Sequence, residues 1–181
     1  LIVRYTLLIA AVLIIVALLV IIPLRSFTIS REKENLEEEA QLFAQEWRRF
    51  FIDEYTIAEI DGYLEELSGE LPTRLTIIDT EGVVLGDSEA EAEDMENHAG
   101  RPEIAAAIEG EVASSSRKSR TIGKNFIYAA APIEVNGEIA GVARISLAEE
   151  DVMPVVYQIW LIFLVAFGVL LVVIIIVSIW T

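Results

Sequence analysis

The chain has 181 residues, 54% of them hydrophobic, a formal net charge of −16 at pH 7 and no cysteine. All 29 acidic residues lie between Glu32 and Asp151. Only Arg4 and Arg25 of the 13 basic residues fall outside residues 26–156, so this segment carries 11 bases against 29 acids. This charge argues against nucleic acid as a partner, because phosphates would be repelled. The lack of cysteine excludes a disulfide framework, a thiolate nucleophile and a cysteine-based zinc site.

Residues 5–24 form an uncharged run between Arg4 and Arg25. At 1.5 Å per residue, a helix of this length is about 30 Å long, which matches the hydrocarbon core of a bilayer. A signal peptide is the alternative. Its apolar region would be shorter, however, and no small-residue cleavage motif follows Pro23. We therefore expect a first transmembrane helix over residues 5–24.

A helical stalk and a second helix are expected over residues 26–71. Apolar residues in the stalk follow the a/d spacing of a heptad pattern, and this seam consists of Ile29, Leu36, Ala40, Phe43, Trp47 and Phe50. The seam can pack on strands of its own domain, pair with a second copy in a parallel dimer, or do both along different parts. The stalk is expected to break near residues 53–55, because Thr56 and Glu59 match a capping box that begins a new helix.

A sheet domain is expected over residues 72–150. Residues 74–88 indicate a hairpin, in which the Glu81-Gly82 turn supplies a residue that tolerates positive φ. Asn136-Gly137 is typical of a type I′ turn and would join the next-to-last strand to the last one.

The remaining elements complete an α+β domain. A polar strand is expected between residues 111 and 121, strands over 126–133 and 139–147, and a short helix over 101–110. With the first hairpin this gives a five-stranded antiparallel sheet. Alternation along the last strand places Arg144 on the face opposite its apolar residues.

Residues 154–181 carry no charge and predict a second transmembrane helix, with Tyr157, Trp160 and Trp180 as an aromatic belt. Two spans place both ends of the chain on the same side of the membrane. The bases Arg4 and Arg25 flank the first span equally, so they do not set the orientation. We expect the acidic central segment outside the cytoplasm, anchored in the plasma (inner) membrane, because it is the natural translocated segment.

Four motifs, in this order along the chain, carry a resemblance: TIIDTEGVVLGDS, NHAGRPEIAAAIEG, SRTIGKNFIYAAAPI and GEIAGVARISL. Together they resemble the extracytoplasmic PAS-like (Cache-type) sensor region of bacterial membrane histidine kinases of the phosphate-regulon type. The resemblance covers about residues 5–181. It implies a five-stranded antiparallel sheet with a long N-terminal helix, and a homodimer paired through the stalk and transmembrane helices.

The resemblance also implies the function expected here, which is the sensory and transmembrane signalling region of a two-component sensor histidine kinase. The kinase core is absent from this sequence, so the chain is not expected to be an enzyme. Its one histidine, His98, lies in a polar loop and is not a phospho-acceptor. The alternative is a standalone membrane-anchored accessory subunit that docks a membrane partner protein. A reading frame that continues past Thr181 into a kinase would distinguish the two.

Candidate binding residues come from the only basic cluster of this acidic segment, which consists of Arg117, Lys118, Arg120 and Lys124. A small anionic ligand would be focused there, near Arg117, Arg120 and the hydroxyl of Tyr128. Alternatively, these bases offset the neighbouring carboxylates Glu109, Glu111 or Glu138. The histidine is expected to bond to loop backbone rather than to sense pH or bind a metal. No catalytic residue, metal site or cofactor is expected.

Overall fold

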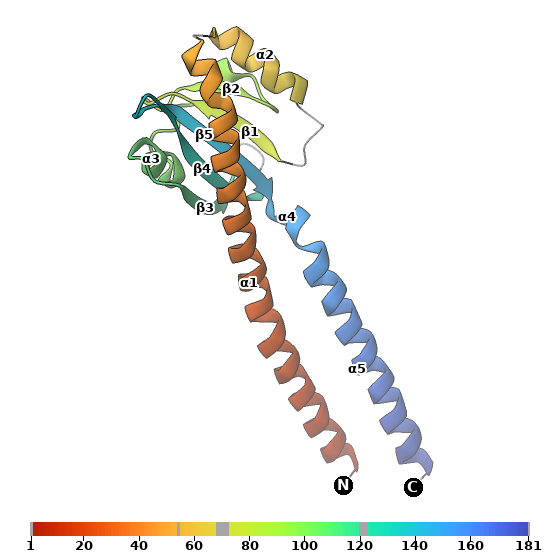
Figure 1. The fold of residues 1–181 in the computed structure, drawn as a ribbon. Helices are drawn as coiled ribbons and strands as arrows, with labels where there is room; N and C mark the ends of the chain where they lie inside the picture. The colour runs from red at the N-terminus through yellow and green to blue at the C-terminus, as the bar shows by residue number, and fades with distance from the viewer. Residues whose placement is uncertain (1, 54, 68–72, 120–122, 181) are drawn as a thin grey trace. The chain divides into compact units, whose positions relative to one another are not determined.

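The computed structural model describes residues 2–53, 55–67, 73–119 and 123–180. The helices are α1 (Ile2–Ile52), α2 (Ile57–Leu67), α3 (Pro102–Ile108), α4 (Glu149–Val152) and α5 (Pro154–Trp180), with a 3₁₀ turn η1 (Ala92–Asp94). The strands are β1 (Arg74–Ile78), β2 (Val84–Asp87), β3 (Ala113–Lys118), β4 (Asn125–Val135) and β5 (Glu138–Ala148) (Figure 1). Residues 31–149 form one compact unit, and the two ends of the chain form a second.

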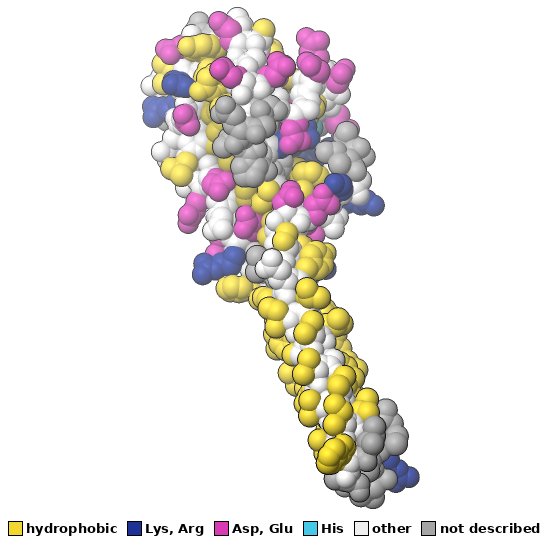
Figure 2. Space-filling model, turned by 90° about the vertical axis from the view of Figure 1, so that its right-hand side faces the viewer, with side chains coloured by type: hydrophobic (Ala, Val, Ile, Leu, Met, Phe, Trp, Pro, Cys, Tyr) yellow, Lys and Arg dark blue, Asp and Glu magenta, His cyan; other side chains and the backbone are white. Residues whose placement is uncertain are grey.

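The terminal unit contains the first part of α1, up to Ser30, and the whole of α5. Both helices are long and apolar enough to cross a membrane, and their apolar stretches are not buried within the protein. Figure 2 shows hydrophobic side chains covering the surface of these helices, whereas Asp and Glu side chains are scattered over the other unit. This is the surface expected of helices whose solvent is lipid.

All strand pairings in the sheet are antiparallel, and the strand order is β2-β1-β5-β4-β3. The α+β fold with a five-stranded antiparallel sheet is therefore confirmed. Because side chains alternate along a strand, Ile77 and Ile145 lie on one face. Thr76, Arg144 and Tyr128 lie on the other, where Thr76 and Ala130 flank Arg144 in the register.

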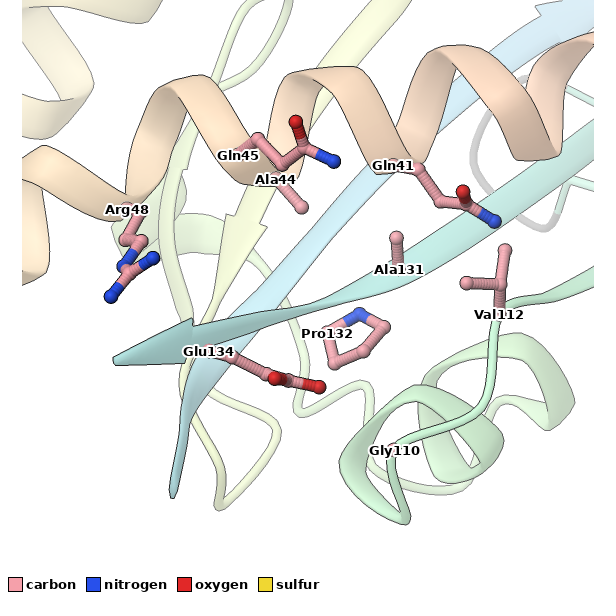
Figure 3. A pocket seen from close by; sticks show the side chains of 9 residues that line it. All are labelled: Gln41, Ala44, Gln45, Arg48, Gly110, Val112, Ala131, Pro132 and Glu134. Atoms are coloured by element: carbon pink, nitrogen blue, oxygen red, sulfur yellow. The ribbon is translucent and has the colours of Figure 1, made fainter. Parts of the chain in front are cut away.

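The stalk part of α1 crosses the apolar face of this sheet (Figures 1 and 3). Its buried residues are Leu36, Ala40, Phe43, Ala44, Trp47 and Phe50. The approach is close: a Cβ placed on Gly141 of β5 would lie 2.7 Å from Cζ of Phe51. Of the two uses predicted for the heptad seam, the structure shows packing on the chain's own sheet.

The local capping and turn predictions are confirmed. The Thr56 backbone N–H donates to Oε2 of Glu59 at 2.8 Å, as a capping box requires. The φ angles of Asn136 and Gly137 are 55° and 86°, which are the two positive values of a type I′ turn. Gly82 in the first hairpin also has a positive φ of 84°.

Replacing Gly137 with valine is expected to destabilise the sheet unit by about 1 kcal/mol or more. A Cβ at this position meets nothing within 4 Å, so the cost comes from the backbone conformation and not from a clash. A β-branched residue resists positive φ. Thermal unfolding followed by near-ultraviolet circular dichroism measures the effect, and Asn136→Gly is the control that should leave the melting temperature nearly unchanged. An unchanged melting temperature for Gly137→Val would contradict the assignment.

Candidate functional site

Two hollows adjoin β4, one on each side of the sheet. The first, of about 540 Å³, lies beside α1, where Ala44 points toward β4 and Ala131 toward α1 (Figure 3). Its charged side chains are one base, Arg48, and one acid, Glu134. With balanced charges and amide side chains, this groove shows no preference for an ion of either sign.

The second hollow, of about 490 Å³, is walled by charged side chains from the polar face of the sheet and from the loop before α3. It is lined by Arg74, Ala90, Glu91, Asp94, Met95, Glu96, His98, Arg101, Arg117, Lys118, Ser119, Tyr128 and Arg144. Five of these residues are cationic and three are acidic, in a unit that is otherwise strongly negative. An anion would be focused here and repelled elsewhere on the surface.

We call this second hollow the cationic cavity. Arg144 is its most deeply buried base, at 3% exposure. Its Nη2 donates to Oγ1 of Thr76 at 2.8 Å and lies 3.9 Å from Oδ2 of Asp87. Its Nε has no hydrogen-bond partner among the described residues. Burial lowers the pKa of Arg144 to about 10, an effect that the Asp87 carboxylate partly offsets, so the guanidinium still carries its charge at neutral pH. A buried cation with an unused donor favours an anionic ligand.

Asp87 anchors two of the arginines from beneath the cavity. Its Oδ1 accepts from Nε of Arg74 at 2.8 Å, and its Oδ2 accepts from Oγ1 of Thr76 at 2.7 Å. The backbone N–H groups of Glu89 and Ala90 also donate to Oδ1. Side chains of β1 and the backbone after β2 therefore hold this carboxylate, and with it Arg74, in one position.

Arg117, one of the predicted binding residues, is held by a second buried carboxylate. Its Nη1 donates to Oε2 of Glu103 at 2.7 Å, and the hydroxyl of Ser115 donates to the same oxygen at 2.6 Å. The guanidinium carbon lies 3.8 Å from the ring centroid of Tyr128, within the range of a cation–π contact. The structure thus brings Arg117 and Tyr128 together. The acid that pairs with Arg117 is Glu103 and not one of the carboxylates suggested by the sequence.

Arg120, the third predicted binding residue, lies outside the described residues. Assignment of a ligand to Arg117, Arg120 and Tyr128 stays a prediction. Sequence reasoning missed Arg74, Arg101 and Arg144 as cavity residues. The signal that could have found Arg144 was its place on a central strand, where a lone base would be buried.

The loop that carries His98 is fastened to the first hairpin. The His98 backbone N–H donates to the carbonyl of Gly82 at 2.7 Å, and Nδ2 of Asn97 donates to the carbonyl of Glu81 at 2.8 Å. Only glycine fits at position 82, because a Cβ there would lie 2.4 Å from the backbone N of Ala99. The ring Nδ1 of His98 donates to the Glu96 carbonyl, which agrees with the predicted bond to loop backbone.

Electrostatics around His98 favour its neutral form. Burial lowers the pKa of His98 below its ordinary 6.5, and the positive charges of Arg144 and Arg101 lower it further. These effects favour the neutral imidazole in the ligand-free protein, while the hydrogen bond to the Glu96 carbonyl and the Glu96 charge act in the opposite direction. Among the residues that the structure describes, no group of three or more His, Asp or Glu side chains is placed to hold a metal ion.

A sheet with a long helix on one face and a lined cavity on the other is the PAS-like architecture of a sensor module. The chain belongs to the single Cache-like family, whose model matches residues 27–148. The comparison with curated proteins gives no match. The fold is that of a sensory Cache domain.

Solved structures of sensor domains share this fold. The chain is similar to the sensor domain of the V. cholerae histidine kinase DctB, with 18% identity over 77% of this chain and a TM-score of 0.55. It is also similar to the ligand-binding domain of the Campylobacter jejuni chemoreceptor Tlp3 in complex with L-norvaline (16%, 74% of this chain, 0.53). A third similar structure is the ligand-binding domain of the Pseudomonas aeruginosa PAO1 chemoreceptor PctC in complex with GABA, with 14% identity over 74% of this chain and a TM-score of 0.51.

The aligned part spans 56%, 59% and 62% of these three solved chains. Both histidine kinases and chemoreceptors are among the similar structures. The fold therefore does not distinguish these receptor classes, and the phosphate-regulon type stays a prediction.

Proposed function

We propose that this chain is the extracytoplasmic sensory and transmembrane region of a two-component sensor histidine kinase, and that its cationic cavity binds a small anionic ligand. The observation that carries the ligand class is Arg144, a buried and charged guanidinium whose Nε is unused among the described residues. L-Norvaline and GABA, which the similar chemoreceptor domains hold, both contain a carboxylate. The ligand class inferred for this cavity is therefore a carboxylate.

The proposed signalling route runs through β5. This strand carries Arg144 and leads through α4 into α5, the second apolar helix. A ligand that binds one conformation of the sheet more tightly than another shifts the balance between them. The same layout serves the alternative function, an accessory subunit that docks a membrane partner.

Protease added to intact cells should cut residues 26–156 if they lie outside the cytoplasm, and protection of this segment there would reverse the proposed topology.

The experiment that tests ligand binding uses the full chain in lipid nanodiscs. Melting temperature and heat of binding would be measured with acetate, succinate and inorganic phosphate, and with acetamide as a neutral control. Anions should raise the melting temperature by mass action while acetamide does not. If no anion binds at millimolar concentration, direct sensing of a small anion is overturned and docking of a partner protein becomes the better explanation.

Replacing Arg144 with leucine should weaken anion binding about tenfold to hundredfold, because a hydrogen bond to a charged group contributes about 1.5–3 kcal/mol. Arg48→Leu, in the groove on the other side of the sheet, is the matched control and should leave binding unchanged. Calorimetry on both variants decides, with ligand-free melting as the check on folding. A probe whose affinity survives combined replacement of Arg117 and Arg120 by alanine would contradict the placement at those residues.

A further inference from the structure

His98 lines the cationic cavity and is held at its backbone and at one ring nitrogen. Its backbone is fixed on both sides, since its N–H donates to Gly82 and its carbonyl accepts from the N–H of Arg101 at 2.9 Å. The ring Nδ1 is committed to the Glu96 carbonyl. A carbonyl can only accept, so Nδ1 carries the hydrogen and Nε2 of the neutral ring is an acceptor. Protonation would convert Nε2 into a charged donor without moving the loop.

The charged groups that share the cavity with His98 come from every element around it. They are Arg74 of β1, Arg117 and Lys118 of β3, Tyr128 of β4, Arg144 of β5, Arg101 at the start of α3, and Glu91, Asp94 and Glu96 around η1. Two further carboxylates pair with arginines of this wall, Asp87 with Arg74 and Arg144, and Glu103 with Arg117. A proton on His98 is opposed by the burial of the ring and by the charges of Arg144 and Arg101. A carboxylate that binds beside the ring offsets the positive charges that oppose this proton.

We propose that His98 is a ligand-binding residue, and that the cavity takes up a carboxylate together with one proton. The proton stays on Nε2, and the Nε2–H of the imidazolium donates a hydrogen bond to the carboxylate. This inference rests on the proposed function, since it concerns how the same cavity holds its anion. It assigns to His98 a role that none of the permanently charged arginines can have, because only the imidazole gains its donor and its charge within the physiological range of pH.

The sign of the pH dependence follows from linkage. In the ligand-free protein the pKa of His98 is lowered, and a bound carboxylate beside the ring raises it. Between these two values the complex holds one more proton than the separate components, so affinity rises as pH falls, by up to about tenfold per pH unit. At a pH above the pKa of His98 in the complex, or below its pKa in the ligand-free protein, the affinity no longer changes with pH through this group.

The test uses the only histidine of the chain, which gives an unambiguous signal in nuclear magnetic resonance. The full chain, labelled with ¹⁵N-histidine and placed in nanodiscs, would be titrated over about pH 5 to 8, without a probe and with saturating acetate or succinate. We expect nitrogen shifts of an Nδ1–H tautomer in the ligand-free protein. With either probe, the midpoint should rise by about one pH unit or more, equivalent to tenfold in affinity.

A variant and a second measurement complete the test. Calorimetry in buffers of different ionisation enthalpy should show proton uptake on acetate binding by the unaltered chain. In His98→Asn the amide replaces Nδ1 as donor to Glu96 but cannot be protonated. Its uptake should vanish and its affinity should lose the slope with pH. The titration of the probe's own carboxyl is common to both proteins and cancels in the comparison.

The outcomes separate this inference from the function on which it rests. If neither probe binds the unaltered chain, the proposed function fails and the inference falls with it. If a probe binds but the midpoint of His98 stays in place, or if His98→Asn keeps the same proton uptake, anion binding stands and the inference about His98 is overturned.

Discussion

Replacing Asp87 with alanine is expected to lower the free energy of unfolding by about 3–5 kcal/mol, because it leaves buried positive charge without its counter-ion. The Asp87 side chain is fully buried, and the guanidinium of Arg144 beside it is almost so. Arg74 also loses its closest carboxylate, which accepts from its Nε. Such a loss is a large part of the 5–15 kcal/mol by which a typical domain is stable.

Two further variants separate charge from shape. Glu89→Ala removes an exposed acid 4.0 Å from Nη1 of Arg74 and should change stability by no more than about 0.5 kcal/mol. Asp87→Asn keeps most of the shape and should fall between the two. Urea unfolding of the three variants would be followed by near-ultraviolet circular dichroism. Equal stability of Asp87→Ala and Glu89→Ala would show that the buried network contributes little.

The turns and helix starts of this protein could be predicted because each depends on residues a few positions apart. The Thr56–Glu59 capping box needs only a hydroxyl and a carboxylate three residues apart. The turn at Asn136-Gly137 needs two residues that accept positive φ. For the same reason, the alternation that placed Arg144 opposite the apolar face was readable from the strand alone.

The ion pairs of the cationic cavity could not be predicted, because they join distant parts of the chain. Thr76 and Arg144 are 68 residues apart, and the β1–β5 register brings them opposite each other. Nothing in the sequence distinguishes Asp87 from the acidic residues that follow it. Its pairing opposite Thr76 is what buries it and makes it the anchor of two arginines.

The heptad seam shows a different limit of sequence reasoning. A stripe of apolar side chains indicates that this face of the helix is buried, but it does not identify the surface that packs against it. Here Phe43 and Trp47 lie with their ring centroids 5.4 Å apart, and Trp47 stacks on Phe50 at 4.4 Å, all buried within the chain. Pairing of two copies through the stalk and transmembrane helices stays a prediction and needs another face of α1.

Replacing Phe43 with aspartate should therefore damage the fold and not simply the association of two copies. Phe43 is 9% exposed, whereas its neighbour Leu42 is 65% exposed on the outer face of the same helix. The change removes a buried aromatic side chain, which alone costs about 3–5 kcal/mol, and adds a charge that is desolvated without a partner. We expect a loss of at least about 4 kcal/mol, which leaves much of the population unfolded.

Leu42→Asp is the matched control, because it introduces the same charge one residue away. Its effect on the free energy of unfolding should stay within about 0.5 kcal/mol, as for other exposed positions. Urea unfolding and sedimentation in nanodiscs, measured on both variants, separate folding from association. If Leu42→Asp reduces dimer content at unchanged stability, the outer face of α1 is the dimer contact. If Phe43→Asp keeps full stability and only loses dimers, the seam belongs to the partner copy and its packing on the sheet is contradicted.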